Sequence, residues 1–583
     1  MSRIIKPISA SYKFFFLGLL LALTFLPAQA LAQNDHSWYV SNNGSDNNNG
    51  WTTGTARKTL HGGILDSLGP GDTLYIMGGR WGETADPDDG GENYIKMASF
   101  DLSHIEGTGA NPIVIRNYPG TFPEIWGDGG VDSPWTRNGV TFYDSKNIIL
   151  DSLRITHNFH YGVIFRGGCE NITVQHCQID SNYIESCGDN GGGVYLGAMP
   201  YGAKNYYCNV MYNHIFDNNY SYPDFLQCTN APGVGGYGNR HGIIRGNIIH
   251  GHTGAAGVKF KGFDNDSNIV DSNVIYDGGV GVEINGGCDT NIVRYNLIYN
   301  VTRGIYFYTY GSASSDHNVF HNNTVYGMDR HWQGVSFGLG NSWSTATTQP
   351  AQHINLFNNI FCNIPMSSTG GPLTFLDVGQ TFDFWDNNLW FGTSGSQTDV
   401  VNWNEQHMTL AEHVSAHGID NNSIWADPQF LSTNPQSADF LKISTTSPAA
   451  TSGRGGAYPT YMGAFNPFSS AHISVSPNSL AFAAQPNGTP PESKSFSITN
   501  AGAGTLEWSI SDNAGWLSVD PVSGSSNSQV VSVYINDTDL PVGQYNAAIT
   551  ISSSNADNSP QTVSVSYKID GTPPIDVGDL DGY

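Results

Sequence analysis

A repeated pattern in the middle of the chain constrains its fold more than any other feature. One submotif is an asparagine followed by an alternating apolar pair. It occurs as NHI, NII, NVI, NLI, NTV and NIF, beginning at Asn213, Asn247, Asn273, Asn296, Asn323 and Asn359. The other submotif is Gly-apolar-x-apolar. It occurs as GVIF, GVYL, GVKF, GVEI, GIYF and GVSF, beginning at Gly162, Gly193, Gly257, Gly281, Gly304 and Gly334. Recurrence of this kind indicates a stacked repeat architecture.

The length of the repeat favours one architecture. GVKF, GVEI and GIYF follow one another at steps of 24 and 23 residues. A unit of that length holds two or three short strands and cannot bury its apolar side alone, so copies must stack. We therefore expect an all-β fold, a right-handed parallel β-helix with one repeat per coil. The recurring asparagines should form a ladder at a turn, bonded to the coils above and below. A β-propeller or a leucine-rich repeat needs a longer repeat or a leucine framework and fits less well.

Both ends of such a stack need a cover, because an open coil is an exposed sheet edge. Near the N-terminus, Leu60, Ile64 and Leu68 recur at four-residue steps, which predicts an amphipathic helix over the first coil. Residues 426–453, followed by YMGAF, are expected to close the other end.

Several stretches of the chain carry a family resemblance. They are WYVSNNGSD, PGDTLYIMGGRW, DPQF, DFLKI, SPA and YMGAF. With the asparagine coils, they resemble the secreted β-helix proteins of the pectate-lyase-like superfold, nearest to the ninth polysaccharide lyase family. The resemblance covers residues 36 to 466, and we assign residues 33–466 to the β-helix domain.

The composition shifts to Ser, Val, Pro and Thr after this domain. About seven short alternating segments in residues 472–568 predict a small immunoglobulin-like β-sandwich. ITNAGAGTLEWSIS and WLSVDPVSG resemble BACON-type modules of secreted carbohydrate-active enzymes. Trp508 and Trp516 are interpreted first as core residues, with sugar platforms as the alternative. Residues 569–583 are expected to be a linker that enters a truncated dockerin-like or calcium-loop start.

The N-terminus predicts export. Residues 1–32 combine basic residues, the apolar run FFFLGLLLALTFL and the small-residue stretch AQALAQ, which is typical of a signal peptide cleaved near residue 32. We expect a secreted or periplasmic protein without a membrane span. The seven cysteines are compatible with disulfides in such a compartment, although an odd number leaves at least one thiol unpaired.

The charge balance limits the partners. The chain holds 24 Lys and Arg against 50 Asp and Glu, for a formal net charge of −26. This acidic surface repels nucleic acids and anionic membranes. A polysaccharide is the expected partner and a monomer the expected state. An anionic glycan would need a local concentration of cations, and Lys259 and Lys261 in GVKFKG offer one.

Strand alternation places these lysines on the outside of a coil. In a gap-free alignment Lys259 lies beside Glu283 and Lys261 beside Asn285, about 4.8 Å apart between coils. The residues expected to bind the glycan lie mostly on this face or in its outward columns, and they are Glu283, Asn285, Tyr306, Tyr308, Tyr195, Arg166 and Arg245. The long segment between Tyr195 and Lys259 can contain an additional coil.

This assortment suits β-elimination on a uronate-containing polysaccharide. A base must remove the proton next to the uronate carboxyl, and a cation must stabilise the enolate. Lys261 and Lys259 can divide these roles, and His250, in the turn that leads into GVKFKG, is a further candidate. We therefore interpret the chain as a polysaccharide lyase. A surface Lys259–Glu283 pair without a role in chemistry is the alternative.

The lyase family resemblance implies a catalytic lysine after a Gly-apolar pair, as Lys261 follows Gly257 and Val258. It also implies calcium bound by clustered carboxylates. Candidate ligands are Asp264, Asp266 and Asp289, for which ordinary turn formation is the alternative. Calcium is the one cofactor considered.

Other functions stay open at this point. A glycoside hydrolase on the same fold needs paired carboxylates, and Glu283 has no evident outward partner. An epimerase needs a Tyr, His and Asp group in one place. A non-catalytic glycan-binding or surface protein requires only the repeat, the tyrosines and the sandwich, and the fold alone does not choose among these functions.

Overall fold

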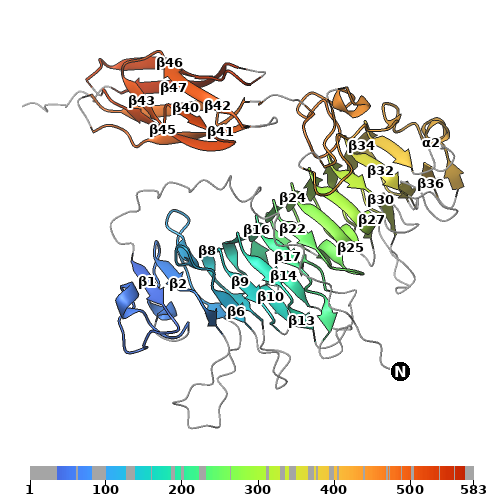
Figure 1. The fold of residues 1–583 in the computed structure, drawn as a ribbon. Helices are drawn as coiled ribbons and strands as arrows, with labels where there is room; N and C mark the ends of the chain where they lie inside the picture. The colour runs from blue at the N-terminus through green and yellow to red at the C-terminus, as the bar shows by residue number, and fades with distance from the viewer. Residues whose placement is uncertain are drawn as a thin grey trace, which may run out of the picture. The chain divides into compact units, whose positions relative to one another are not determined.

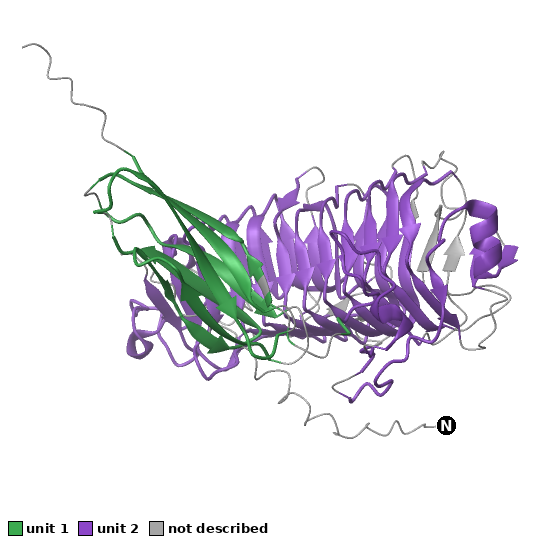
Figure 2. Cartoon of the chain, turned by 90° about the horizontal axis from the view of Figure 1, so that it is seen from above, with its two compact units in different colours: residues 1–29, 466–583 green, residues 30–465 purple. Residues whose placement is uncertain are grey.

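The structure is a computed structural model of the chain. It describes residues 36–570 with gaps at 61–63, 82–99, 127–137, 159, 185–190, 198–202, 222–230, 263, 310–313, 328–334, 340–349, 365–372, 376–378, 393–399, 404–405, 438–439, 445, 468–470, 472, 487–488, 501–504, 538 and 557–558. The expected signal peptide and residues 571–583 of the expected C-terminal linker therefore lie outside the described residues, whereas Ile569 ends strand β47 (Gln561–Ile569). The chain divides into two compact units between Phe465 and Asn466 (Figure 2).

The unit of residues 30–465, purple in Figure 2, is a stack of coils, each with up to three strands that pair in parallel with the next coil (Figure 1). One coil contains β21 (Ile243–Arg245), β22 (Ile248–His250) and β23 (Ala256–Lys261). We call the three resulting columns of strands ladder 1, ladder 2 and ladder 3, in that order. This arrangement confirms the predicted parallel β-helix.

Ladder 1 is the main path of a 14-stranded sheet. Its strands are β1 (Ser37–Val40), β2 (Thr73–Ile76), β5 (Ile113–Asn117), β8 (Lys146–Asp151), β11 (Glu170–Gln175), β16 (Asn209–Met211), β21, β24 (Ile269–Asp271), β26 (Ile292–Arg294), β28 (Val319–His321), β31 (Ile354–Phe357) and β34 (Phe382–Asp386). The short strands β15 (Asn205–Tyr206) and β20 (Asn239–Arg240) join the same sheet.

Ladders 2 and 3 form one 22-stranded sheet, because β25 (Val274–Asn285) and β27 (Leu297–Thr309) run through both. The other strands of ladder 2 are β3 (Arg80–Trp81), β6 (Glu124–Trp126), β9 (Arg154–Thr156), β12 (Gln178–Asp180), β17 (His214–Phe216), β22, β29 (Thr324–Tyr326), β32 (Ile360–Ile364), β35 (Leu389–Gly392) and β38 (Ile424–Trp425). Those of ladder 3 are β4 (Phe100–Ser103), β7 (Val140–Tyr143), β10 (Tyr161–Arg166), β14 (Gly192–Gly197), β19 (Val234–Tyr237), β23, β30 (Val335–Leu339), β33 (Leu373–Phe375) and β36 (Val401–Trp403), which pairs with β37 (Gln406–Met408). A separate pair, β13 (Tyr183–Ile184) and β18 (Tyr220–Ser221), completes the list.

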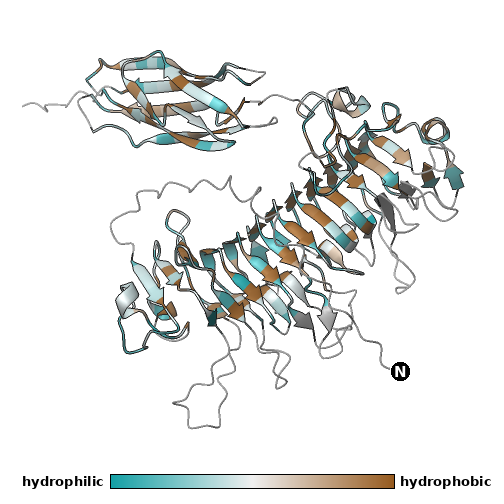
Figure 3. Cartoon of the chain, viewed as in Figure 1, coloured by the Kyte–Doolittle hydropathy of each residue, from teal (hydrophilic) through white to brown (hydrophobic). Residues whose placement is uncertain are grey.

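Alternation along each strand builds the core. Val258 and Phe260 of β23 and Val282 and Ile284 of β25 are fully buried inside the coils. The intervening residues point outward, because side chains alternate along a strand. The resulting alternation of apolar and polar residues along the strands is visible in Figure 3.

The predicted asparagine ladder is confirmed at the turn between ladders 1 and 2. Each side-chain Nδ2 donates to Oδ1 of the asparagine in the next coil. The donor to acceptor distances are 3.1 Å for Asn213 to Asn247, 2.9 Å for Asn247 to Asn273, 2.9 Å for Asn273 to Asn296, 2.9 Å for Asn296 to Asn323 and 3.0 Å for Asn323 to Asn359. The structure extends the ladder to Asn388, whose Oδ1 accepts from Asn359 at 3.0 Å.

The N-terminal end differs from the prediction. Leu60 and Ile64 are buried as expected, but the chain forms only a 3-10 turn, η3 (Leu65–Ser67), with η2 (Thr53–Thr55) earlier in the segment. The predicted amphipathic helix is therefore wrong for the described part of this segment. Two consecutive glycines, 62 and 63, are poor helix formers and precede the turn.

The C-terminal end of the stack is covered by α2 (Leu410–His417). Thr409 and Glu412 form a capping box at its start, and Gly418 ends it in the left-handed region. Leu410 is buried in the β-helix core, and the ring of the buried His413 lies 5.6 Å from that of Trp385.

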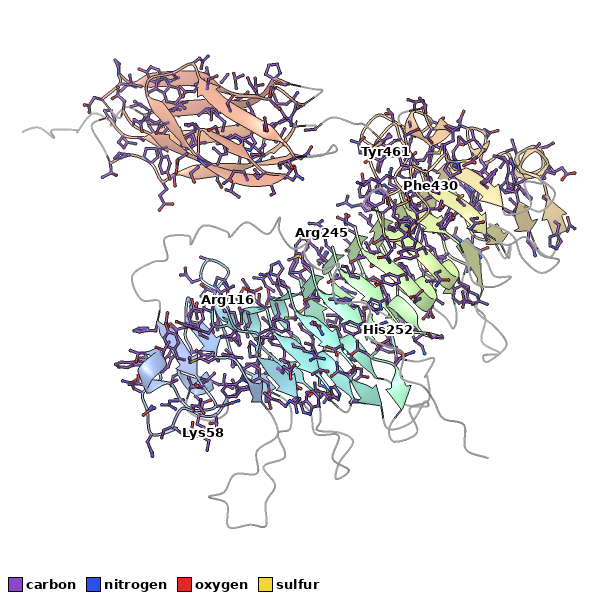
Figure 4. All side chains as sticks on the ribbon, in the orientation of Figure 1. Lys58, Arg116, Arg245, His252, Phe430 and Tyr461 are labelled. Carbon is purple, nitrogen blue, oxygen red and sulfur yellow. The ribbon has the colours of Figure 1, made fainter. Side chains whose placement is uncertain are left out.

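Residues 426–465 do not close this end, contrary to the prediction. They pack along the side of the coils, where Figure 4 shows Phe430 and Tyr461. Asn322 Nδ2 donates to the Tyr461 carbonyl at 3.0 Å, Asn387 Nδ2 donates to the Ser452 carbonyl at 3.1 Å, and Phe440 lies 4.8 Å from the ring of Tyr299. The backbone carbonyls of this segment thus accept hydrogen bonds from asparagine side chains at the turns of several coils.

The expectation of disulfides is wrong for the described cysteines. Cys169, Cys177, Cys208, Cys288 and Cys362 are free and buried. They behave as small apolar core residues. Cys187 and Cys228 lie outside the described residues.

The unit that contains residues 466–570, green in Figure 2, is a β-sandwich, which confirms the predicted fold class. One sheet contains β39 (Ile473–Ser476), β41 (Lys494–Asn500), β45 (Ser528–Ile535) and β43 (Leu517–Asp520). The other contains β40 (Ser479–Ala484), β47 (Gln561–Ile569), β46 (Gly543–Ser552), β42 (Glu507–Asp512) and β44 (Ser523–Ser525). Trp508 is buried in the core, and Trp516 packs 5.5 Å from the ring of Tyr567.

Among the described residues, no helix is long and apolar enough to cross a membrane.

Candidate functional site

The outer face of ladder 3 carries the predicted lysine columns. Lys259 pairs in register with Glu283, which pairs with Tyr306. In the second column Lys261 pairs with Asn285, which pairs with Tyr308. The backbone of Tyr308 is described, but its side chain is not. A gap-free alignment of the repeats was sufficient to predict these neighbours.

An additional coil lies between Tyr195 and Lys259. Tyr195 pairs with Gly235 of β19, and Gly235 pairs with Lys259. Gly235 has no side chain on this face, and Pro232 occupies the space: a Cβ atom at Gly235 would lie only 2.5 Å from Cγ of Pro232. Pro232 therefore packs on the glycine and stands beside Lys259.

These residues enclose a pocket. Its lining is Gly191, Tyr195, Pro232, Gly236, Tyr237, Lys259 and Lys261. The rings of Tyr195 and Tyr237 are 6.2 Å apart, and Tyr161 continues the row 4.6 Å from Tyr195. The pocket thus combines an aromatic and proline wall with two amines.

Sequence reasoning missed Pro232 and Tyr237. The signal was the stretch GVGGYG at 233–238, which begins as another Gly-apolar repeat. Recognising it would have added the coil that supplies both residues.

The two lysines differ in their electrostatic surroundings. Lys259 Nζ lies 3.1 Å from Glu283 Oε1, and the two side chains are only 16% and 8% exposed. Asn285 Nδ2 donates to the same Oε1 at 2.6 Å. Lys261 forms no ion pair with any residue that the structure describes, and its Nζ lies 5.9 Å from the centre of the Tyr237 ring. Lys259 is therefore held by a carboxylate, whereas Lys261 has no carboxylate partner among the described residues.

Tyr306 stands two coils from Lys259. Burial raises the pKa of its phenol, Glu283 adds to this shift and Arg303 opposes it. The Arg303 guanidinium lies 4.5 Å from the centre of the Tyr306 ring. Tyr306 is accordingly suited to donate a hydrogen bond and not to act as a base.

His250 does not join the lysine pocket. It belongs to ladder 2, where its ring stacks between Phe216 and Tyr276 at 5.1 and 4.6 Å. Its Nε2 lies 2.8 Å from Nε2 of His214. Burial lowers the pKa of His250 to about 4, with a further contribution from His214.

Neither of the two predicted arginines lines the pocket. Arg245 belongs to ladder 1 and its Nη2 lies 2.8 Å from Asp271, which Arg294 also contacts at 3.2 Å. Figure 4 shows Arg245 on the side of the β-helix away from His252, which precedes β23. Arg166 is on ladder 3, but β14 and β19 lie between its strand and that of Lys261.

The predicted calcium site is not formed. Asp264 contacts Lys204 at 2.7 Å, and Arg240 contacts both Asp264 and Asp266. Asp266 Oδ1 also accepts from the backbone N of Asp289 at 3.0 Å. Across the described ranges, no group of three or more His, Cys, Asp or Glu side chains could hold a metal ion. These carboxylates instead form ion pairs with Lys204 and Arg240 and accept hydrogen bonds from backbone N–H groups.

Comparison with known proteins supports the two-domain description. Residues 197–341 match the family model described as right handed beta helix region, and residues 472–564 match that of the viral BACON domain. The chain contains a right-handed β-helix and a BACON-like domain. These matches confirm the predicted right-handed β-helix and the predicted BACON-like module, whereas the resemblance to the ninth polysaccharide lyase family stays a prediction.

Several solved structures are similar to this β-helix protein. Pectate lyase Pel9A is 13% identical, with 75% of this chain and 98% of that chain covered and a TM-score of 0.46. The GH136 lacto-N-biosidase from Eubacterium ramulus is 16% identical, with 67% of each chain covered and a TM-score of 0.43. A rhamnogalacturonan lyase is 14% identical, with 70% of this chain and 97% of that chain covered and a TM-score of 0.43. Likeness at this level carries no argument about activity. No curated protein matches the chain.

Proposed function

We propose that this chain is a carbohydrate-active protein that cleaves a uronate-containing polysaccharide by β-elimination in the lysine pocket. One observation carries the proposal: Lys259 and Lys261 line a pocket together with Tyr195, Pro232 and Tyr237. Aromatic rings pack on the faces of sugars, and amines meet the carboxylate of a uronate.

The different surroundings of the two lysines suit them to different steps of the reaction. Lys259, paired with Glu283, is placed to bind the uronate carboxylate and to stabilise the negative charge that develops there. Lys261 has no carboxylate partner in the described structure, so its neutral amine is the candidate base for the proton next to the carboxyl. The bond from the neighbouring carbon to the glycosidic oxygen then breaks, a carbon–carbon double bond forms, and the leaving oxygen takes a proton.

Hydrolysis is less compatible with this pocket. A glycosidase of the usual kind needs two carboxylates on opposite sides of the scissile bond. The side chains that line the pocket in the described structure include none, and Glu283 is engaged by Lys259 and Asn285.

The first prediction concerns Lys261. Lys261→Met should lower the rate of uronate elimination at least 100-fold, because general base catalysis typically contributes a factor of that size or more. The rate is measured as ultraviolet absorbance of unsaturated uronates during incubation with pectate, alginate or glycosaminoglycans.

Lys146→Met is the matched control. Lys146 is an exposed lysine of ladder 1 whose ammonium lies 3.4 Å from Glu106, so its loss should leave the rate unchanged. New reducing ends without ultraviolet absorbance would support hydrolysis and contradict elimination. Retention on a glycan gel with neither product would identify a binding protein. Full activity of Lys261→Met would refute the assignment of the base.

A further inference from the structure

Positive charge is sparse along the outer face of ladder 3. The outward pairs, in coil order, are Thr141 and Tyr143, Ile164 and Arg166, Tyr195 and Gly197, Gly235 and Tyr237, Lys259 and Lys261, and Glu283 and Asn285. Cations occur in only two of these six coils, and the two coils between them carry no charge on this face. The next coil presents Tyr306 with Arg303 over its ring.

Among the described residues, the charged side chains in and beside the pocket sum to one positive charge. Glu283 offsets Lys259 at 3.1 Å, and both groups are mostly shielded from water, so Lys261 is the lining cation without a carboxylate partner in the described structure. A second anionic group placed one coil further on would lie over Glu283, and like charges at such a distance repel. One coil in the other direction it would meet Gly235 and Tyr237, the uncharged outward pair that the structure describes there.

The aromatic row indicates how a glycan would lie. Tyr195 and Tyr237 lie on neighbouring coils with their ring centres 6.2 Å apart, so a chain that stacks on both rings passes from one coil to the next. Coils repeat at about 4.8 Å, and an extended glycan advances by a similar distance with each sugar. Consecutive sugars would therefore lie over consecutive coils.

We infer that the glycan bound in this pocket carries its anionic groups apart, with neutral sugars between them, and not one carboxylate on every sugar. This inference rests on the proposed glycan-binding function of the pocket. It specifies the substrate as an acidic heteroglycan of low charge density, because the sugars beside the acidic one meet tyrosines on one side and a buried carboxylate on the other.

The test compares ligands that differ only in charge density. Polygalacturonate and the same polymer with about half of its carboxyls reduced to alcohols are titrated into the full chain by calorimetry, at a pH where cleavage is slow. The partly reduced polymer should bind at least tenfold more tightly. Lys261→Met should weaken both, and Lys146→Met should weaken neither.

Two variants at Glu283 test whether its negative charge causes the preference for the partly reduced polymer. Glu283→Gln keeps an oxygen for Asn285 but removes the negative charge, so it should tighten binding of the unreduced polymer about tenfold and abolish the preference. Lys259→Met combined with Glu283→Gln also lacks the carboxylate, so it should show no preference and should bind both polymers more weakly than Glu283→Gln. This double variant also serves if the single variant is poorly folded.

The outcomes separate the inference from the proposed function. If the wild-type protein binds neither polymer, the proposed function fails for galacturonate ligands, and the same pair of probes made from alginate decides it for other uronates. If the unreduced polymer binds as tightly as the reduced one, through Lys261, the proposed function stands and the inference is overturned. A preference unaffected by Glu283→Gln also overturns it.

Discussion

At the scale of the residue, the pair formed by His214 and His250 makes the stability of the protein depend on pH. Their Nε2 atoms lie 2.8 Å apart, which requires that at least one ring be neutral and accept the hydrogen bond. Burial lowers the pKa of both imidazoles to about 4, and the proximity of His214 adds to the shift at His250. A folded-state pKa below the unfolded value of about 6.5 means that the unfolded chain binds the proton first as the pH falls.

We therefore expect acid to destabilise the protein through this pair. Stability should be fully present above pH 6.5 and lost as the pH falls towards 4, by up to about 3 kcal/mol for one histidine. In His250→Phe the ring can still stack on Phe216 and Tyr276, so the variant should lose about 2 to 3 kcal/mol less than the wild type between pH 7.5 and 4.5. Urea unfolding at both pH values measures this difference.

Tyr276→Phe is the control for the histidine prediction, because Phe keeps the ring that stacks on His250 and the change removes no imidazole. It should show the same loss of stability between pH 7.5 and 4.5 as the wild type. An identical loss for His250→Phe and the wild type would show that this pair does not carry the effect.

At the scale of the element, the asparagine ladder holds the turns between ladders 1 and 2. Asn273 shows how each member works. Its Oδ1 accepts from the backbone N of Asn247 at 3.0 Å, and its Nδ2 donates to the Ile244 carbonyl at 2.9 Å. One side chain therefore satisfies two buried backbone groups that belong to the preceding coil.

Replacing this amide should be costly. Asn273→Leu is similar in size but leaves the Asn247 N–H and the Ile244 carbonyl without partners, and each such group costs about 1 to 3 kcal/mol. We expect a loss of roughly 3 to 5 kcal/mol in the free energy of unfolding, measured by urea denaturation. Asn434→Ala, at an exposed turn, should change it by less than about 0.5 kcal/mol. Equal effects of the two substitutions would contradict this account of the ladder.

At the scale of the whole molecule, the two compact units have separate cores. Ile305 and Phe307 belong to the core of the β-helix, whereas Val533 and Ile549 belong to that of the sandwich. Each core buries its own apolar surface, so each unit holds the interactions needed to fold by itself.

Calorimetry of the full chain should accordingly show two unfolding transitions. Ile549→Ala should lower the temperature of one transition only, and Ile305→Ala should lower the other, since each truncation of a buried isoleucine costs about 2 to 5 kcal/mol. A single transition that both substitutions shift by the same amount would show that the units unfold together.

The sequence by itself determined the coil, the asparagine ladder and the register of Lys259 with Glu283. These features depend on alternation along a strand and on the 24-residue step from GVKF to GVEI, and both are local properties of the chain. The same reasoning could not place a coil across a long insertion, so it missed β19 and with it Pro232 and Tyr237.

Only the tertiary structure decided which residues meet across long separations. In the structure Asp264, one of the candidate calcium ligands, forms ion pairs with Lys204 and Arg240. His250 lies on ladder 2, whereas Lys261 lies on ladder 3. It also made α2 the cap and laid residues 426–465 along the coils. The physical reason is that these contacts depend on how coils and insertions pack in three dimensions, which the period of the repeat does not encode.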